Sequence, residues 1–315
     1  MRTTICIRSF NRPKELLVAL ESCFEQSAEC RVIIVDDGSN LATQNIIRDS
    51  TEAKQNVDIV FLPENLGPSN ALNVAIASAA TEFLGFLDCD DTLLPEFVER
   101  MQLALDQNPW AEFAYCRFVG GPSWKISGTD LFREVLKSGT LSANGTLFGY
   151  ARSFRTLPKL PTRQELHTLD YNEDDRLSFE IARNHGIVHV PEELYVYRTH
   201  SGYRLSADFP KMLLSWKRFL EDYQEDYEKH LGALGFGVRM GQVFGQYGSG
   251  SVPAKDFLGG AISFSNPRRR IFARNFGFLW GNLGFRARKV LRRFRRSLRW
   301  LRVRVTEFAR THRIF

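Results

Sequence analysis

Acidic residues follow two short apolar runs of the chain. Asp88, Asp90 and Asp91 come directly after the apolar run 83–87 and place three carboxylates within four residues. Such carboxylates repel one another, and a cation relieves the repulsion. Oxygen ligands favour Mg²⁺ or Mn²⁺, which also share coordination with the phosphates of a substrate. The group is therefore a candidate metal site. The alternative is a solvated acidic turn in which Asp91 or Thr92 caps the next helix.

The second acidic pair, Asp36 and Asp37, follows the apolar run 32–35 and precedes Gly38. Asp-Gly is common in turns, so the pair alone fits either a turn or a binding site. Because side chains alternate along a strand, one carboxylate can face inward while the other meets a ligand.

The elements that must position these acids alternate through the first 120 residues. Short runs rich in Ile, Val and Phe predict strands at 3–9, 31–35, 57–62, 82–87 and 112–118. Amphipathic patterns predict helices at 13–25, 41–49, 69–79 and 95–107. This order predicts an α/β fold with a Rossmann-like, mainly parallel sheet and helices on both faces. Ligands of such sheets bind beyond the carboxyl ends of the strands.

The second half of the chain has a weaker pattern. A helix is expected at 173–184, an extended segment at 186–190 followed by a turn at 191–194, and a longer helix at 210–234. The stretch 235–260 contains eight glycines and is typical of a linker.

Every expected strand end is followed by a polar segment. In chain order the segments are Ser9-Phe10-Asn11-Arg12, Val35-Asp36-Asp37-Gly38-Ser39, Asn65-Leu66-Gly67 followed by Ala71-Leu72-Asn73, and Leu87-Asp88-Cys89-Asp90-Asp91. In this order and spacing they resemble family 2 glycosyltransferases with the GT-A fold. The resemblance is specific over 3–120 and continues more weakly to about residue 206. It implies transfer of a sugar from a nucleotide-diphosphate donor to a hydroxyl, with inversion at the anomeric carbon.

The resemblance also implies roles for single residues. Asp37 would contact the base or ribose, Asp88 and Asp90 would form the DxD site for metal and diphosphate, and Asp91 would be a further metal ligand. The other expected donor contacts are Ser9, Asn11, Arg12, Asn65, Gly67 and Asn73. This chain reads Ala71-Leu72-Asn73 where the family commonly reads Ala-Arg-Asn, so a base near the nucleotide is missing. Arg12 could supply that charge, or it is an exposed residue before Pro13.

Two later motifs carry the resemblance into the second half. Glu173-Asp174-Asp175 resembles the family's Glu-Asp motif at a helix start, whose aspartate deprotonates the acceptor, and Asp174 is the expected base. The alternative is that these acids complement the dipole of a helix N-terminus. Tyr197-Arg198-Thr199-His200 resembles a Tyr-Arg-x-His element, in which Arg198 would reach the phosphates and His200 the metal or diphosphate. The alternative for His200 is a structural role.

Charge divides the chain into an acidic body and a basic tail. Residues 266–315 hold sixteen Lys or Arg and one acid, a net charge of 16 − 1 = +15, while residues 1–265 have 26 bases and 35 acids, a net charge of −9. Apolar residues recur at helical spacing over 287–308, opposite arginines. Such a helix is typical of an anionic membrane surface. The alternatives are packing against the body and binding of nucleic acid, which the acidic body disfavours.

Together these patterns predict three parts: a GT-A domain at 1–234, divided at 120 into a donor half and an acceptor half, a linker at 235–265 and a basic helical tail at 266–315. Five scattered cysteines and the lack of a leader pattern favour a cytoplasmic protein, peripheral on the inner face of a membrane. The predicted function is metal-dependent transfer to a saccharide or lipid-linked saccharide. The rival functions are a nucleotidyltransferase and a nucleic-acid-binding protein.

Overall fold

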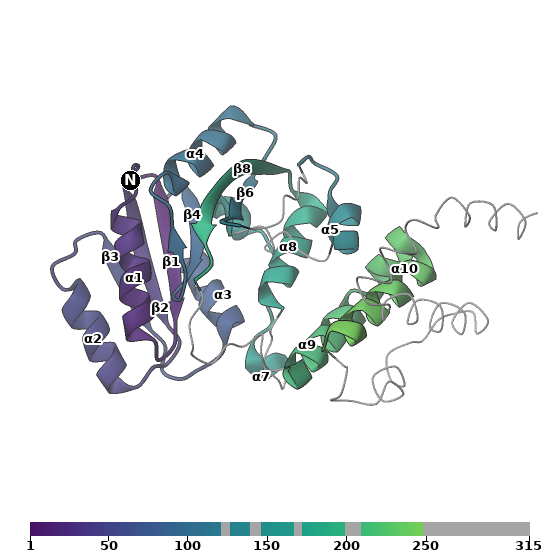
Figure 1. Ribbon diagram of the computed structural model, residues 1–315, viewed down its shortest axis with the longest axis horizontal. Helices are drawn as coiled ribbons and strands as arrows, with labels where there is room; N and C mark the ends of the chain where they lie inside the picture. The colour runs from purple at the N-terminus through teal and green to yellow at the C-terminus, as the bar shows by residue number, and fades with distance from the viewer. Residues whose placement is uncertain (121–126, 139–145, 167–171, 199–208, 248–315) are drawn as a thin grey trace, which may run out of the picture. The chain divides into compact units, whose positions relative to one another are not determined.

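The computed structural model describes residues 1–120, 127–138, 146–166, 172–198 and 209–247 (Figure 1). Within these ranges the chain builds an eight-stranded sheet in the order β3-β2-β1-β4-β7-β6-β8-β5. The strands are β1 Thr3–Ser9, β2 Cys30–Asp36, β3 Val57–Phe61, β4 Phe83–Asp88, β5 Thr92–Leu93, β6 Phe113–Phe118, β7 Leu147–Tyr150 and β8 Ile187–Val196.

Helices connect most of these strands. They are α1 Pro13–Phe24, α2 Leu41–Thr51, α3 Pro68–Ser78, α4 Phe97–Gln107, α5 Phe132–Ser138, α6 Ala151–Phe154, α7 Arg163–Leu166, α8 Glu173–Asn184, α9 Phe209–Asp222 and α10 Gln224–Tyr247. The prolines at the starts of α1 and α3 suit the first helical turn, where their missing N–H has no partner to lose.

The sheet is mainly parallel, as expected. Strands β3, β2, β1 and β4 run in one direction, and β6 and β8 are parallel to each other. β7 lies antiparallel between β4 and β6, and β5 is antiparallel to β8. Neither β5 nor β7 was expected, because β5 has only two residues and β7 is a four-residue strand in a region of weak pattern.

Helices cover both faces of the sheet. One buried cluster joins strand residues such as Ile5 to apolar residues of α1, α2 and α4, among them Met101. On the opposite face Phe154 of α6 packs edge-on against the rings of Phe86 and Phe113, with centroids 5.2 and 4.8 Å apart. The side-chain alternation of β4 and β6 sends their apolar residues into both layers.

The expected turn at 191–194 is wrong. β8 runs through it to Val196, and its pairing with β6 shifts register between the pairs Tyr115–His189 and Arg117–Glu193. Pro191 lies within this irregular stretch, where a residue without an N–H group is tolerated.

The C-terminal part also differs from expectation. Two helices, α9 and α10, replace the single helix expected at 210–234, and α10 continues to Tyr247 into the expected linker. α10 is kinked at Gly232, whose φ of 72° and ψ of 169° are not helical. Beyond the kink, Phe236 and Val243 are buried. The chain forms two compact units, Met1–Phe219 and Leu220–Phe315. No helix in the described ranges is long and apolar enough to span a membrane. The rest of the expected linker and the tail at 266–315 lie outside the described residues.

Candidate active site

Strands β1, β2 and β4 end side by side. In their parallel pairing Ser9 lies opposite Asp36, and Arg8 lies opposite Asp88. The polar segments that follow these strands therefore meet at one edge of the sheet, the edge at which ligands bind in open parallel sheets.

Asp37 holds the loop that follows β3. Its two carboxylate oxygens accept hydrogen bonds from the backbone N–H groups of Leu66 and Gly67, each at 2.9 Å. Gly38, with φ 74°, packs so closely that a Cβ there would lie 2.3 Å from the carbonyl carbon of Glu64. Only glycine combines that backbone conformation with that contact. Asp37 and Gly67 are thus brought together, and a contact of either with the nucleotide stays a prediction.

Asn11 joins the loops after β1 and β2. Its backbone N–H donates to Oγ of Ser39 at 2.7 Å, and its Oδ1 accepts from the N–H of Asn40 at 3.0 Å. Ser9 takes part as well, because its carbonyl accepts from the N–H of Asp37 at 2.8 Å. Asn11 and Ser9 thus link the ends of β1 and β2. Contacts of either residue with a donor stay predictions.

Asn73 lies on α3 and binds the backbone of Leu160. Its Nδ2 donates to the Leu160 carbonyl at 2.8 Å, and its Oδ1 accepts from the Leu160 N–H at 3.0 Å. Both ends of the amide therefore hold the segment after α6. Asn65 is half-buried in the loop before α3. Donor contacts by Asn73 and Asn65 stay predictions.

The acidic turn after β4 gathers three carboxylates. Ligand oxygens of Asp88, Asp90 and Asp91 all lie within 4.8 Å of one another. An arginine accompanies each of the first two: Arg8 pairs with Asp88, and Arg12 pairs with Asp90. Cations thus offset the repulsion that the sequence pattern implies. The oxygen-only donor set fits Mg²⁺ or Mn²⁺.

Asp91 differs from its neighbours because it is buried and fully engaged by β8 and the segment after it. Its Oδ2 accepts from the hydroxyl of Tyr195 at 2.5 Å, and its Oδ1 accepts from the backbone N–H of Arg198 at 2.9 Å. Burial raises the pKa of Asp91 to about 6, although these two hydrogen bonds oppose the shift. Burial also raises the pKa of Tyr195 well above its usual value, with Asp88 and Asp91 adding to the effect. Asp91 therefore ties the turn to β8, whereas the side chains of Asp88 and Asp90 are more exposed, at 43% and 24%.

The three acids that begin α8 have different surroundings. Glu173 is buried and pairs with Arg8, with Oε1 and Nη1 3.1 Å apart. Asp175 is buried and accepts a hydrogen bond from Nδ2 of Asn172 at 3.0 Å. Asp174 has a side chain 46% exposed, and its Oδ1 lies 3.9 Å from Nη2 of Arg8. Of these acids, Asp174 is the one that lines the pocket described next.

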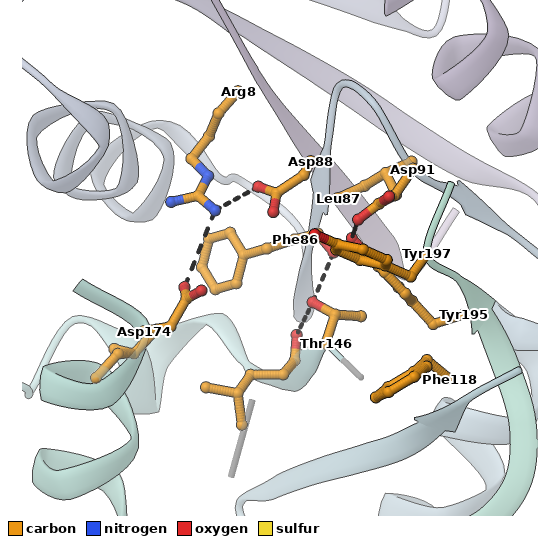
Figure 2. A pocket seen from close by; sticks show the side chains of 12 residues that line it. Arg8, Phe86, Leu87, Asp88, Asp91, Phe118, Thr146, Asp174, Tyr195 and Tyr197 are labelled. Carbon is orange, nitrogen blue, oxygen red and sulfur yellow. Dashed lines mark hydrogen bonds and ion pairs between the residues drawn. The ribbon is translucent and has the colours of Figure 1, made fainter. Parts of the chain in front are cut away.

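A pocket of about 380 Å³ lies between the acidic turn and α8 (Figure 2). Its lining combines charged groups with aromatic and aliphatic side chains: Arg8, Phe86, Leu87, Asp88, Asp91, Phe118, Thr146, Leu147, Asp174, Leu177, Tyr195 and Tyr197. Figure 2 shows the guanidinium of Arg8 between the carboxylates of Asp88 and Asp174. The expected DxD acid and the expected base thus share one cavity.

Arg8 lines the pocket and was not predicted from the sequence pattern. The available signal was a single charged residue inside the expected strand 3–9. A charge in a buried strand requires charged or polar partners. The partners themselves come from β4 and α8, far away in the chain. His200, the remaining predicted metal ligand, lies outside the described residues.

The model of the family described as "Glycosyl transferase family 2" matches residues 4–156. The chain is 28% identical over 122 residues to an uncharacterized glycosyltransferase of Haemophilus influenzae, covering 37% of this chain and 49% of the relative. It is 29% identical over 110 residues to the succinoglycan biosynthesis protein ExoU of Rhizobium meliloti, covering 34% of this chain and 31% of the relative. It is 23% identical over 243 residues to EpsH of Bacillus subtilis, covering 75% of this chain and 66% of the relative. The matched stretches span about a third to two thirds of these relatives.

Solved structures share the fold at low sequence identity. S. aureus TarS 1–349 in complex with UDP-GlcNAc superposes with a TM-score of 0.61 at 16% identity, over 90% of each chain. The mannosyltransferase PcManGT from Pyrobaculum calidifontis, in complex with GDP-Man and Mn²⁺, gives a TM-score of 0.55 at 17% identity, over 90% of this chain and 87% of that one. The fold is that of GT-A glycosyltransferases, and residues 4–156 match glycosyltransferase family 2.

Proposed function

We propose that this protein transfers a sugar, with inversion, from a nucleotide-diphosphate sugar to a hydroxyl acceptor, with the help of a divalent metal ion. The observation that supports it most is the shared pocket of Asp88 and Asp174. Asp88 belongs to the turn suited to the diphosphate, and Asp174 begins the helix suited to the acceptor. A transfer reaction requires both substrates to meet in one cavity.

Asp88 and Asp90 would hold the metal, with Asp91 supporting their turn. When bound, Mg²⁺ or Mn²⁺ acts as a Lewis acid on the departing diphosphate. Arg12, paired with Asp90, contributes a second positive charge beside the same group. Arg198 would reach the phosphates, and its backbone N–H already donates to Asp91 in the same turn.

Asp174 would take the proton of the acceptor hydroxyl. Its side chain is about half-exposed, so an acceptor can reach it. A base in hydrogen-bond reach of the hydroxyl contributes about 10² to 10⁴ in rate. Attack from the face opposite the leaving diphosphate then inverts the anomeric carbon.

The acceptor is proposed to be a saccharide, free or lipid-linked. Phe118 and Tyr197 line the pocket with ring centroids 6.5 Å apart, and Tyr197 is 52% exposed. Aromatic faces of this kind suit the apolar face of a sugar ring, while the carboxylates suit its hydroxyls. One relative, ExoU of Rhizobium meliloti, is a succinoglycan biosynthesis protein, and succinoglycan is a polysaccharide.

The basic tail is proposed to hold the enzyme at the inner face of the membrane. Each basic residue near an anionic bilayer contributes about 1 kcal/mol. Truncation after Ser265 removes the +15 tail and should release the protein from anionic liposomes while donor hydrolysis persists. Unfolding of the truncated protein would show that the tail packs on the body instead, and persistent liposome binding would place the membrane contact elsewhere.

The donor assignment is tested by thermal stabilisation of the full chain. UDP- and GDP-sugars are tested with and without Mn²⁺, because the structural neighbours were solved with UDP-GlcNAc and with GDP-Man and Mn²⁺. A donor at a hundred times its dissociation constant stabilises the fold by about 2.7 kcal/mol. We expect one donor to stabilise the protein only with the metal present. If no combination of nucleotide sugar and Mn²⁺ stabilises the protein, and no sugar is transferred, the proposal is contradicted.

A further inference from the structure

Arg8 contacts carboxylates from both sides of the pocket. Its side chain is only 12% exposed. One guanidinium nitrogen, Nη2, pairs with Asp88 and lies 3.9 Å from Oδ1 of Asp174. The other, Nη1, donates to Oε1 of Glu173 at 3.1 Å. Arg8 thus links the end of β4 to the first turn of α8 (Figure 2).

These contacts have a clear electrostatic cause. Asp88, Glu173 and Asp174 converge on one point and would repel one another without a cation. An arginine guanidinium is charged at all ordinary pH values, so it attracts these three carboxylates.

The pair of Arg8 with Glu173 bears on the position of Asp174, the proposed base. α8 begins at Glu173, and Glu173 is the more buried of the two α8 acids that meet Arg8, with a side chain 12% exposed against 46% for Asp174. The pair of Arg8 with Glu173 therefore fixes the start of the helix relative to β1. Asp174, the next residue, takes its position from that anchor.

We propose that Arg8 is a positioning residue that sets the distance between the base Asp174 and the donor site at Asp88. This inference rests on the proposed function. The planar guanidinium presents its nitrogens in a fixed fork and can serve carboxylates from two elements at once. A lysine ammonium is a flexible point charge and would keep the charge without the geometry. A misplacement of about 1 Å at a reacting group can cost about a hundredfold in rate.

The test compares Arg8→Lys and Arg8→Met with Arg2→Met as the matched control. Arg2 also pairs with two acids, Glu82 and Asp106, but its side chain is 46% exposed and lies outside the pocket lining. Transfer kinetics give kcat and KM, and calorimetry with Mn²⁺ and the nucleoside diphosphate gives donor-side affinity. We expect kcat to fall about tenfold in Arg8→Lys and about a hundredfold in Arg8→Met. Donor-side affinity should stay within about threefold of the wild type.

Glu173→Gln provides a second variant that keeps the size of the side chain. If Arg8 acts through Glu173, the losses of Arg8→Met and Glu173→Gln will not add in the double variant. Additive losses, or a loss of donor affinity parallel to kcat, would overturn the positioning role and make Arg8 a diphosphate ligand. An active wild type with unchanged kcat in both Arg8 variants would contradict this inference alone, whereas a wild type without any transfer would contradict the proposed function.

Discussion

The hydroxyl of Tyr195 donates a hydrogen bond of 2.5 Å to Oδ2 of Asp91 and thereby ties the acidic turn after β4 to strand β8. Both groups are buried. Asp91 and Tyr195 are far apart in the sequence, so the bond couples the order of the acidic turn after β4 to the packing of β8.

Tyr195→Phe should therefore lower the free energy of unfolding and change the affinity for Mn²⁺ little. Leaving a buried acceptor without its donor costs about 1 to 3 kcal/mol, measured by urea unfolding. Tyr197→Phe, which changes an exposed tyrosine, is the control and should shift stability by less than about 0.5 kcal/mol. A large loss of Mn²⁺ affinity without a loss of stability would instead make Asp91 mainly a metal ligand.

Asp90→Asn should abolish metal-dependent donor binding and leave the fold intact. Arg12 already offsets the charge of Asp90, so the free energy of unfolding should change little. Asp106→Asn is a matched control, because Asp106 pairs with Arg2 away from the pocket. Calorimetry with a nucleotide sugar and Mn²⁺ is the measurement. An unchanged affinity of Asp90→Asn for the nucleotide sugar with Mn²⁺ would show that Asp90 does not bind the metal.

The buried cysteines should make the protein less stable at high pH. Burial raises the pKa values of Cys6, Cys30, Cys89 and Cys116 to about 12, from a usual value near 9. Between these values the unfolded chain binds fewer protons than the native state, so the free energy of unfolding falls as pH rises. Urea unfolding from pH 8.5 to 10.5 tests this, and Cys6→Ala should reduce the slope. An unaltered slope in that variant would show that other groups govern it.

The same burial predicts slow reaction of the native thiols with iodoacetamide near pH 8, since the thiolate is the reactive form. Cys89 is the informative site because it lies within the acidic turn. Rapid labelling of Cys89 in the native protein would show that this turn opens in solution.

Tyr197→Ala should weaken use of the acceptor. The exposed ring faces Phe118 at the pocket, so its loss removes apolar contact with an acceptor sugar. We expect the acceptor KM to rise about tenfold, with the donor KM unchanged, since the substitution leaves the acidic turn untouched. Tyr197→Phe, which keeps the ring, should retain the wild-type acceptor KM. An equal rise for Tyr197→Phe would assign the effect to the hydroxyl rather than to the ring.

Local pattern was sufficient for the N-terminal half of the fold. β2 and β4 are buried on both faces, and each contains an apolar run, 32–35 and 83–87, that ends at an aspartate. β1 has a shorter apolar run, Ile5 to Ile7, within a buried strand. β7 was not predicted because its four residues are too few to show a pattern. One of them, Gly149, is required by packing, since a Cβ there would lie 2.4 Å from the ring of Phe113. That partner lies on another strand, so the constraint is visible only in three dimensions.

The site residues likewise include some that could be predicted from the sequence and some that could not. The acids of the turn after β4 could be predicted because they follow one another in sequence. The separate surroundings of Glu173, Asp174 and Asp175 could not, since they depend on Arg8 for the first and on Asn172 for the third. Sequence places three equivalent acids at a helix start, and only tertiary contacts distinguish them.

Asp174 is the proposed base for the acceptor hydroxyl. Measuring kcat for Asp174→Asn and for Asp175→Asn, with donor affinity for both, tests this role most directly. We predict a loss of about a hundredfold or more in kcat for Asp174→Asn at unchanged donor affinity, because an amide cannot accept the proton. Asp175→Asn should retain most of its turnover, since Asp175 is buried against Asn172 and lies outside the pocket lining. A crippled Asp175→Asn beside a nearly normal Asp174→Asn would contradict the assignment.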